Sequence, residues 1–226
     1  MFFYTEKLPS KLKGYLKGLC DAQLLIQGYN FLEDVLTVDI CNELKKCTNW
    51  IPLIDDYEED LIGLVANNYL GPMLTSQDRI QTLNVLSENH PVHLYTTSDI
   101  STVPNVIFKG IANPNTMMPY IFKCSKINLN ITSKSIKTGL PLRIFDILAC
   151  QGFLITNFQP EIPEYFEDGV RLVTYNSIPD LLEKVDYYIK HEDERLKIAK
   201  NGYEKVKNHY TYIHRLNQMI CIAWNL

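Results

Sequence analysis

The sequence predicts an α/β fold, a parallel sheet with flanking helices and extra helices at the N-terminus. From about residue 76 onward, short apolar runs of strand length alternate with segments whose apolar residues recur at helical spacing. Before that point the recognisable periodic patterns are helical. Strands that alternate with helices are typical of a parallel sheet covered by helices on both faces.

Residues 1–75 are predicted to form a helical segment packed on a second domain, residues 76–226. Apolar residues repeat at helical spacing through the first 50 residues, with a break at residues 28–30. A further helix is expected from Leu61 to Leu70, ended by Gly71 and Pro72. The change of pattern near Ser76 marks the boundary between the two parts.

The second domain is expected to alternate strands and helices along its length. Short apolar runs predict strands at residues 92–96, 106–108, 127–131, 153–156 and 171–175. Helices are expected to begin near Ser76, Pro114, Pro141, Glu161, Ser177 and Glu192, with a last one over residues 216–223. Ser177 has the residue type and position of an N-cap.

Composition excludes several classes of protein. The net charge of −4 and the pI of about 5.7 argue against a nucleic-acid-binding surface. A run of 18 apolar residues is missing, so we expect no membrane span. The six cysteines form no C-x-x-C pair, which argues against a zinc knuckle and predicts reduced thiols in a cytoplasmic protein.

The segment from Thr132 to Asp146 is the strongest candidate for a binding loop. Ligands of parallel α/β sheets bind at the carboxyl ends of the strands, and this segment follows an expected strand. It enters a helix at Pro141, and proline is favoured at the first helical position. The free amides of a first helical turn can hold a phosphate. Residues 126–145 contain no acidic side chain, which suits an anionic ligand.

Individual residues of this region suggest a nucleotide. Arg143 can form paired hydrogen bonds with phosphate oxygens, and the Asp146 carboxylate can accept hydrogen bonds from two ribose hydroxyls. Glu161 can contact sugar hydroxyls or simply cap a short helix. The ligand-binding residues expected from these patterns are Thr132, Lys134, Lys137, Thr138, Gly139, Arg143, Asp146, Asn157 and Glu161. A solvated basic loop at an ordinary helix entry is the alternative, and these residue types alone leave both open.

Two other patterns suggest a metal site and a signalling domain, and each fits less well. His90 and His93 flank a proline that prevents a helix, so they do not predict a metal site. Residues 51–56 resemble the first strand and acidic pair of a receiver-like signalling domain. Such a domain needs an aspartate at the end of a central strand, and the expected strands end in Thr96, Phe108, Ile131 and Thr156.

The motifs at residues 127–132, 138–147 and 152–157 closely resemble the C-terminal domain of bacterial CgeB-like glycosyltransferases, the spore-coat-maturation type. Residues 15–31 and 187–211 also fit, so the resemblance spans almost the whole chain. It implies the Rossmann-like C-terminal half of a GT-B fold that binds a nucleotide diphosphate sugar as donor substrate for hexosyl transfer. By this resemblance, Asp146 holds the donor ribose and Arg143 lies near the diphosphate. No D-x-D motif occurs, so we expect no metal and no cofactor.

Three departures from the family qualify this expectation. Thr138 stands where many GT-B enzymes carry a glutamate, and Cys150-Gln151-Gly152 replaces a pattern with paired glycines. The chain also starts after the family's first strand and its acceptor domain. We therefore expect no transfer by this chain alone, and pairing of an open sheet edge with the missing domain or a second copy. A non-catalytic module that binds a nucleotide or a partner protein is the alternative.

Overall fold

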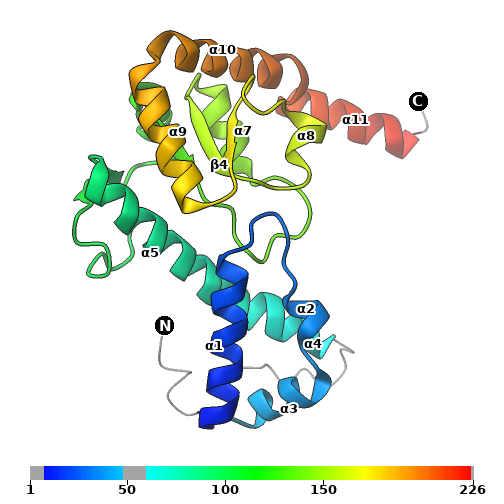
Figure 1. Ribbon diagram of the computed structural model, residues 1–226. Coiled ribbons are helices and arrows are strands. Elements are labelled where there is room, and N and C mark those ends of the chain that lie inside the picture. Colours follow the sequence, from blue (N-terminus) through cyan, green and yellow to red (C-terminus); the bar gives the residue numbers. More distant parts are fainter. Residues whose placement is uncertain (1–7, 48–59, 225–226) are drawn as a thin grey trace. The chain divides into compact units, whose positions relative to one another are not determined.

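The structure is a computed structural model that describes residues 8–47 and 60–224 (Figure 1). Residues 51–56, the segment that resembles part of a receiver domain, lie outside the described residues. The chain divides into two compact units. The helical unit comprises residues 1–82 and 132–137, and the sheet unit comprises residues 83–131 and 138–226. The division expected after residue 75 and this one after Thr82 fall within the same helix.

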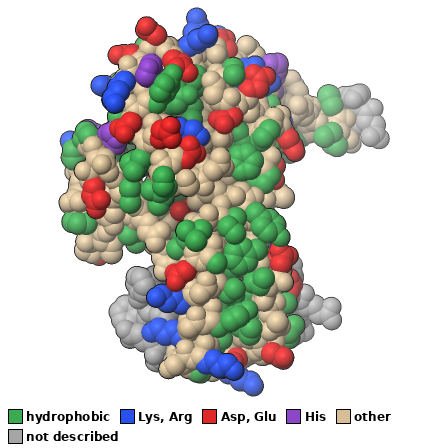
Figure 2. All heavy atoms as spheres, in the orientation of Figure 1, with side chains coloured by type: hydrophobic (Ala, Val, Ile, Leu, Met, Phe, Trp, Pro, Cys, Tyr) green, Lys and Arg blue, Asp and Glu red, His purple; other side chains and the backbone are tan. Residues whose placement is uncertain are grey.

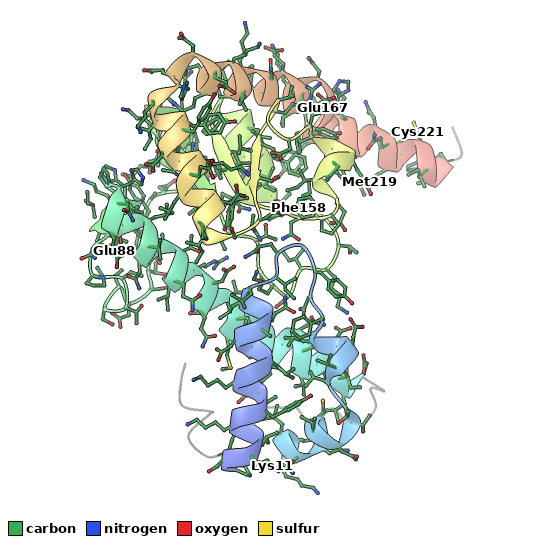
Figure 3. The ribbon with its side chains drawn as sticks, in the orientation of Figure 1. Lys11, Glu88, Phe158, Glu167, Met219 and Cys221 are labelled. Carbon is green, nitrogen blue, oxygen red and sulfur yellow. The ribbon has the colours of Figure 1, made fainter. Side chains whose placement is uncertain are left out.

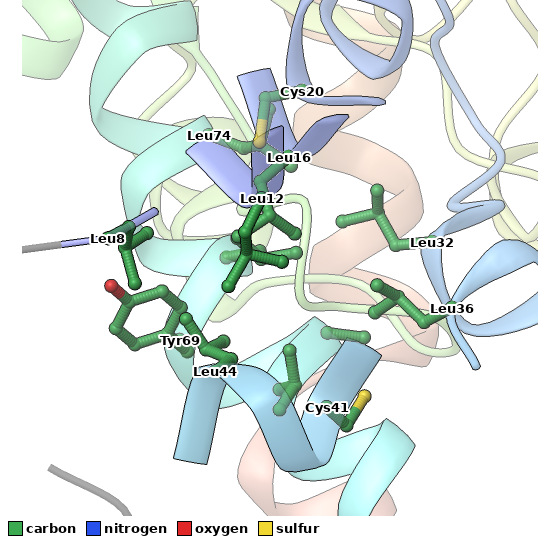
Figure 4. Close-up of a cluster of buried hydrophobic side chains, with 13 residues drawn as sticks. Leu8, Leu12, Leu16, Cys20, Leu32, Leu36, Cys41, Leu44, Tyr69 and Leu74 are labelled. Carbon is green, nitrogen blue, oxygen red and sulfur yellow. The ribbon is translucent and has the colours of Figure 1, made fainter. Parts of the chain in front are cut away.

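The helical unit is built from the helices that the first part of the sequence predicts. Leu12, Leu16, Leu32 and Leu44 are buried in its core, which Figure 4 shows. The expected break is confirmed, because Gly28 adopts a φ of 75° between two helices. Its elements are α1 (Ser10–Leu24), α2 (Leu32–Val35), α3 (Val38–Cys47), α4 (Leu61–Gly63), the π-helix η2 (Leu64–Leu70) and the first part of α5 (Gly71–Asn89).

The prediction that Gly71 and Pro72 end a helix was wrong. The chain stays helical from Leu61 through η2 and on to Asn89 in α5. A proline normally clashes with the carbonyl four residues earlier, and the wider π-helical turn before Pro72 offers a way around that clash. The role of Gly71 is instead to let Ser135 pack close to the helix backbone. A Cβ at this position would lie 2.1 Å from Ser135 Oγ, so a larger residue fits there only if the Ser135 side chain moves.

The sheet unit holds two groups of parallel strands. β1 (His93–Leu94) pairs with β2 (Ile107–Phe108), and β4 (Leu154–Asn157) lies between β3 (Asn128–Asn130) and β5 (Val173–Tyr175). The five predicted strands are thus confirmed within a few residues. Its helices are the end of α5, α6 (Met118–Cys124), α7 (Leu142–Ala149), α8 (Ile162–Tyr165), α9 (Ile178–Lys190), α10 (Glu192–His209) and α11 (Tyr212–Trp224).

Helices cover both faces of the three-stranded sheet, as the sequence predicts (Figure 1). On one face Ile155 and Tyr175 pack against Leu181 of α9. On the other face Leu154 packs in a cluster with Ile147 of α7. Strands buried on both faces are typical of parallel sheets, and every residue of β4 and β5 is buried.

Two helices near the C-terminus form as the local sequence predicts. Ser177 is the N-cap of α9, as predicted, and its Oγ accepts a hydrogen bond from the Asp180 amide at 3.3 Å. The last predicted helix forms as α11. Its described residues include none that is buried, and Met219 is 65% exposed (Figure 3).

Candidate functional site

The three strands β3, β4 and β5 run parallel, so their carboxyl ends meet at one edge of the sheet. Near that edge, Asn130, Thr156 and Thr174 stand in register across the strands. Asn130 Nδ2 donates a hydrogen bond to Thr156 Oγ1 at 2.9 Å, and Thr174 Oγ1 donates one to Asp168 Oδ2 at 2.8 Å. All three side chains of the row are buried. They make a polar band at the edge where ligands of such sheets bind.

Sequence reasoning missed this polar band. The signal was present, because Asn128 and Asn130 alternate with Leu129 in a strand that is otherwise apolar. Alternate residues of a strand share a face, so both asparagines point to the same side. Asn128 Nδ2 donates to the carbonyl oxygens of Phe122 and Phe153, at 2.8 and 3.2 Å, which joins α6 to the sheet.

Helix α7 begins just beyond this edge. Pro141 is its N-cap and not its first residue, because its ψ of 140° is extended. The amide of Ile144 is the first to bond back, to the Pro141 carbonyl oxygen at 3.0 Å. The amides of Leu142 and Arg143 precede it, and amides in the first turn of a helix have no acceptor within the helix. The expected anion-binding geometry at the start of α7 is therefore available.

Arg143 and Asp146 lie on the exposed side of α7. They are three residues apart, a spacing that places side chains on one helical face, while Ile144 and Ile147 are buried on the other side. The Arg143 guanidinium carbon lies 5.4 Å from the centre of the Phe122 ring in α6. This cation–π contact orients the guanidinium and leaves N–H groups for an anion. The exposed face of α7 thus presents one cation and one carboxylate together.

Gly139, three residues before the start of α7, is hydrogen-bonded to Glu161. Gly139 has a φ of 84°, which glycine adopts without strain, and its amide donates to Glu161 Oε1 at 3.2 Å. Glu161 stands at the N-cap position of α8, but its side chain makes no capping hydrogen bond there. Capping of its own helix is therefore not the role of Glu161. Its Oε2 is buried with no hydrogen-bond partner among the described residues.

Two further expected residues lie close to this part of the chain. Asn157 is the last residue of β4 and is fully buried, so the protein encloses its side chain. Thr138 is exposed, next to Gly139. The sheet unit therefore contains Thr138, Gly139, Arg143, Asp146, Asn157 and Glu161.

The structure places the remaining three expected residues in the helical unit. Thr132 is 2% exposed, and Lys137 forms an ion pair with Glu33 of α2. Lys134 Nζ is buried and contacts Gln27 Oε1 at 2.7 Å, the Ile26 carbonyl oxygen at 3.2 Å and an Asp78 oxygen at 3.5 Å. A buried ammonium group that already has three oxygen partners has little capacity left for a phosphate from solvent.

Burial changes the ionisation of the Lys134–Asp78 pair. It raises the pKa of the Asp78 carboxyl and lowers the pKa of the Lys134 ammonium, and the attraction between the two groups opposes both changes. Both charged forms are therefore costly to bury, and each depends on the other to remain in place.

Other features of the surface lie away from this site. A shallow hollow is lined by Cys150, Gln151 and Tyr203 among others, at the C-terminal end of α7 and therefore near the opposite sheet edge. Acidic and basic side chains are mixed over the sheet unit on the face in Figure 2. Within the described residues, no cluster of three or more His, Cys, Asp or Glu side chains offers a metal site, and no helix is long and apolar enough to cross a membrane.

A parallel sheet with helices on both faces, and a helix start beyond its carboxyl edge, is a Rossmann-like arrangement, and such folds bind their ligands at that edge. Residues 79–220 match the glycosyl transferase-like family, and the chain belongs to that family. The chain is also 28% identical over 153 residues to the spore protein CgeB of Bacillus subtilis (strain 168). This stretch covers 67% of the chain and 42% of the spore protein, so the chain spans less than half of that relative. The resemblance to CgeB-like glycosyltransferases is thereby confirmed.

Proposed function

We propose that the sheet unit binds the nucleoside diphosphate part of a nucleotide sugar, the donor of a glycosyl transfer. The observation that carries this proposal is the arrangement of Arg143 and Asp146 on the exposed face of α7, next to a helix start whose first amides are free. The family supports a glycosyltransferase domain, and the carboxyl edge of a parallel sheet is the usual ligand position.

Each group has a role that follows from its chemistry. The first amides of α7 and the Arg143 guanidinium bind the diphosphate oxygens, and the Asp146 carboxylate accepts hydrogen bonds from the ribose hydroxyls. In a transfer reaction, negative charge grows on the diphosphate as it leaves the sugar. Fixed donors aimed at that charge stabilise the transition state without reorganisation. Binding at these groups therefore serves catalysis as well as affinity.

Glu161 is suited to the transferred sugar. The Gly139 amide donates to Glu161 Oε1 and so orients the carboxylate, while Oε2 has no hydrogen-bond partner among the described residues. A sugar hydroxyl can donate to this carboxylate. The negative charge of Glu161 disfavours a phosphate at the same point. We therefore place the sugar near Glu161 and the diphosphate near Arg143.

We propose that donor binding needs neither a metal ion nor a cofactor, because the sequence has no D-x-D motif to hold a cation on the diphosphate. Calorimetry with ADP, GDP, UDP, CDP and dTDP, each with and without EDTA, tests both statements. We expect one diphosphate to bind, with equal affinity in EDTA. At a concentration of 100 times Kd, one-site binding adds about 2.7 kcal/mol to the free energy of unfolding. Failure of all five to bind at millimolar concentration would refute the proposal.

We propose donor binding, and not complete transfer, as the activity of this chain alone. The described residues offer groups for the donor, but we can assign none of them to an acceptor. Without an acceptor held about 3–3.5 Å from the reacting carbon, a transferase loses the roughly 7–11 kcal/mol that proximity supplies. Acceptor-dependent transfer by the purified chain would contradict this. Binding of a nucleotide with no hydrolysis or transfer in any reconstituted system would instead favour a non-catalytic binding module.

A further inference from the structure

Residues 133–137 have no regular secondary structure, yet side chains of the helical unit hold them at many points. Thr75 Oγ1 accepts from the Lys134 amide at 3.1 Å, and Asn30 Nδ2 donates to the Lys134 carbonyl oxygen at 2.8 Å. Ser135 Oγ donates to the Asn67 carbonyl oxygen at 2.9 Å. We call this segment, residues 133–137, the loop anchor.

The buried pair of Asp78 and Lys134 lies at the centre of the loop anchor. Their side chains are 4% and 6% exposed, and Asp78 comes from α5 while Lys134 comes from the loop. Removing one member of a buried ion pair leaves the other charge without compensation in a medium of low polarity. The pair therefore ties the position of the loop to α5 much more strictly than a surface ion pair would.

Close packing adds to this restraint. The missing side chain of Gly71 is what allows Ser135 to approach the backbone of α5, because a Cβ there would lie 2.1 Å from Ser135 Oγ. At the far end of the anchor, Lys137 pairs with Glu33. The anchor is thus fixed at its start, centre and end by three different elements of the helical unit.

The loop anchor leads directly into the residues of the proposed donor site. Thr138 follows Lys137 in the chain, and Gly139, Pro141 and Arg143 come within the next five residues. Residues 138–140 are partly or fully exposed and adopt no helix or strand. The anchor fixes the point from which this short segment starts, so it restricts the backbone conformations open to Thr138 and Gly139.

We propose that Asp78 and Lys134 are positioning residues for nucleotide binding, which act by holding the loop anchor and thereby ordering residues 138–143. This inference rests on the proposed function, because it assumes that those residues meet the donor. It gives the helical unit a role in nucleotide binding, and it accounts for the burial of Lys134 in a loop that is otherwise rich in exposed basic residues.

The first experiment separates positioning from plain stability. The Asp78→Asn variant of the full chain is compared with Leu12→Ala, which removes core volume from the helical unit without touching the loop. Affinity is measured for the diphosphate of the five that binds the wild-type chain most tightly. Amide hydrogen exchange of residues 133–143 is measured without nucleotide. Temperatures are chosen so that both variants are folded to the same extent.

We expect Asp78→Asn to weaken binding at least tenfold and to speed exchange in residues 138–143, while Leu12→Ala leaves both near wild type. Equal effects of the two variants, or wild-type affinity and exchange in Asp78→Asn, would overturn the inference. If the wild-type chain binds no diphosphate, the proposed function fails by itself. Hydrogen exchange then still decides whether the pair orders residues 138–143.

A double-mutant cycle tests the pairing and covers the case in which a single variant does not fold. Asp78→Asn and Lys134→Met each leave one buried charge alone, whereas the double variant leaves none. We expect the double variant to fold and to bind more tightly than either single variant, because it leaves no buried charge without a partner. Losses that simply add in the double variant show that the two residues are not coupled, and that would overturn the inference.

Discussion

Lys134 Nζ lies 3.5 Å from Asp78 Oδ2, and neither side chain is more than 6% exposed. This lysine belongs to the basic loop that the sequence predicts as a phosphate-binding loop, and it comes 56 residues after Asp78 in the chain. Arg143, nine residues further along the chain, is exposed. The same loop therefore contains one cation that holds the protein together and another that is free to meet a ligand.

Arg143→Ala should weaken the binding of a nucleoside diphosphate more than that of the monophosphate. Charge-assisted hydrogen bonds contribute about 1.5–3 kcal/mol, so we expect the diphosphate affinity to fall roughly tenfold to a hundredfold. Calorimetry with both nucleotides measures the difference. Arg171→Ala is the matched control, because Arg171 is an arginine of the sheet unit whose ion pair with Glu167 is long, at 3.7 Å. Equal losses for the two nucleotides would leave Arg143 with a structural role.

Asp146→Asn should reduce nucleotide affinity about tenfold or more without unfolding the chain. The amide keeps the shape of the carboxylate but lacks the charge that strengthens the bonds from ribose hydroxyls. Asp193→Asn, at the start of α10, is the control. Since α9 runs back from the carboxyl edge, α10 begins at the opposite edge of the sheet. A folded Asp146→Asn variant with wild-type affinity would remove this residue from the site.

Gly139→Ala and Gly169→Ala form a matched pair. Both glycines have positive φ, 84° and 72°, and a Cβ at either would meet no atom within 4 Å. The cost is then the left-handed backbone alone, about 1–2 kcal/mol of unfolding free energy in each variant. Only Gly139→Ala should also weaken nucleotide binding. Thermal unfolding and calorimetry measure the two effects, and a similar loss of affinity in Gly169→Ala would show that strain, not the site, is responsible.

Stability should fall at alkaline pH in a way that depends on Cys20. Burial, aided by the nearby charge of Asp21, raises the pKa of this thiol from 9.0 to about 11. Because the unfolded thiol loses its proton first, the free energy of unfolding falls as the pH rises from about 9 toward 11. The full change is at most about 3 kcal/mol. Denaturant titrations at pH 8 and pH 11 should show a smaller decrease for Cys20→Ala than for wild type, and equal decreases would contradict this cause.

Local sequence predicted the elements of the sheet unit well. The apolar runs at residues 153–156 and 171–175 overlap with β4 and β5, and Ser177 caps a helix because its hydroxyl reaches the Asp180 amide. These features depend on side-chain type and spacing over a few residues. The error at Gly71 and Pro72 has a different origin. The helix continues through that pair by way of the π-helical turn η2, a rare element that helical spacing does not predict.

The sequence by itself determined the family, the alternation of strands and helices, and a loop with basic and hydroxyl residues that enters α7. Only the tertiary structure decided which residues of that loop face solvent. Arg143 and Asp146 are exposed because the helical period places Ile144 and Ile147 in the core. Lys134 is buried because Asp78 of α5 and the loop residues Ile26 and Gln27 after α1 converge on its ammonium group. The type of a charged residue determines what its side chain can bind, but the fold determines which groups come within reach. A charge is tolerated in the interior only where a group of opposite charge or hydrogen-bond partners lie next to it.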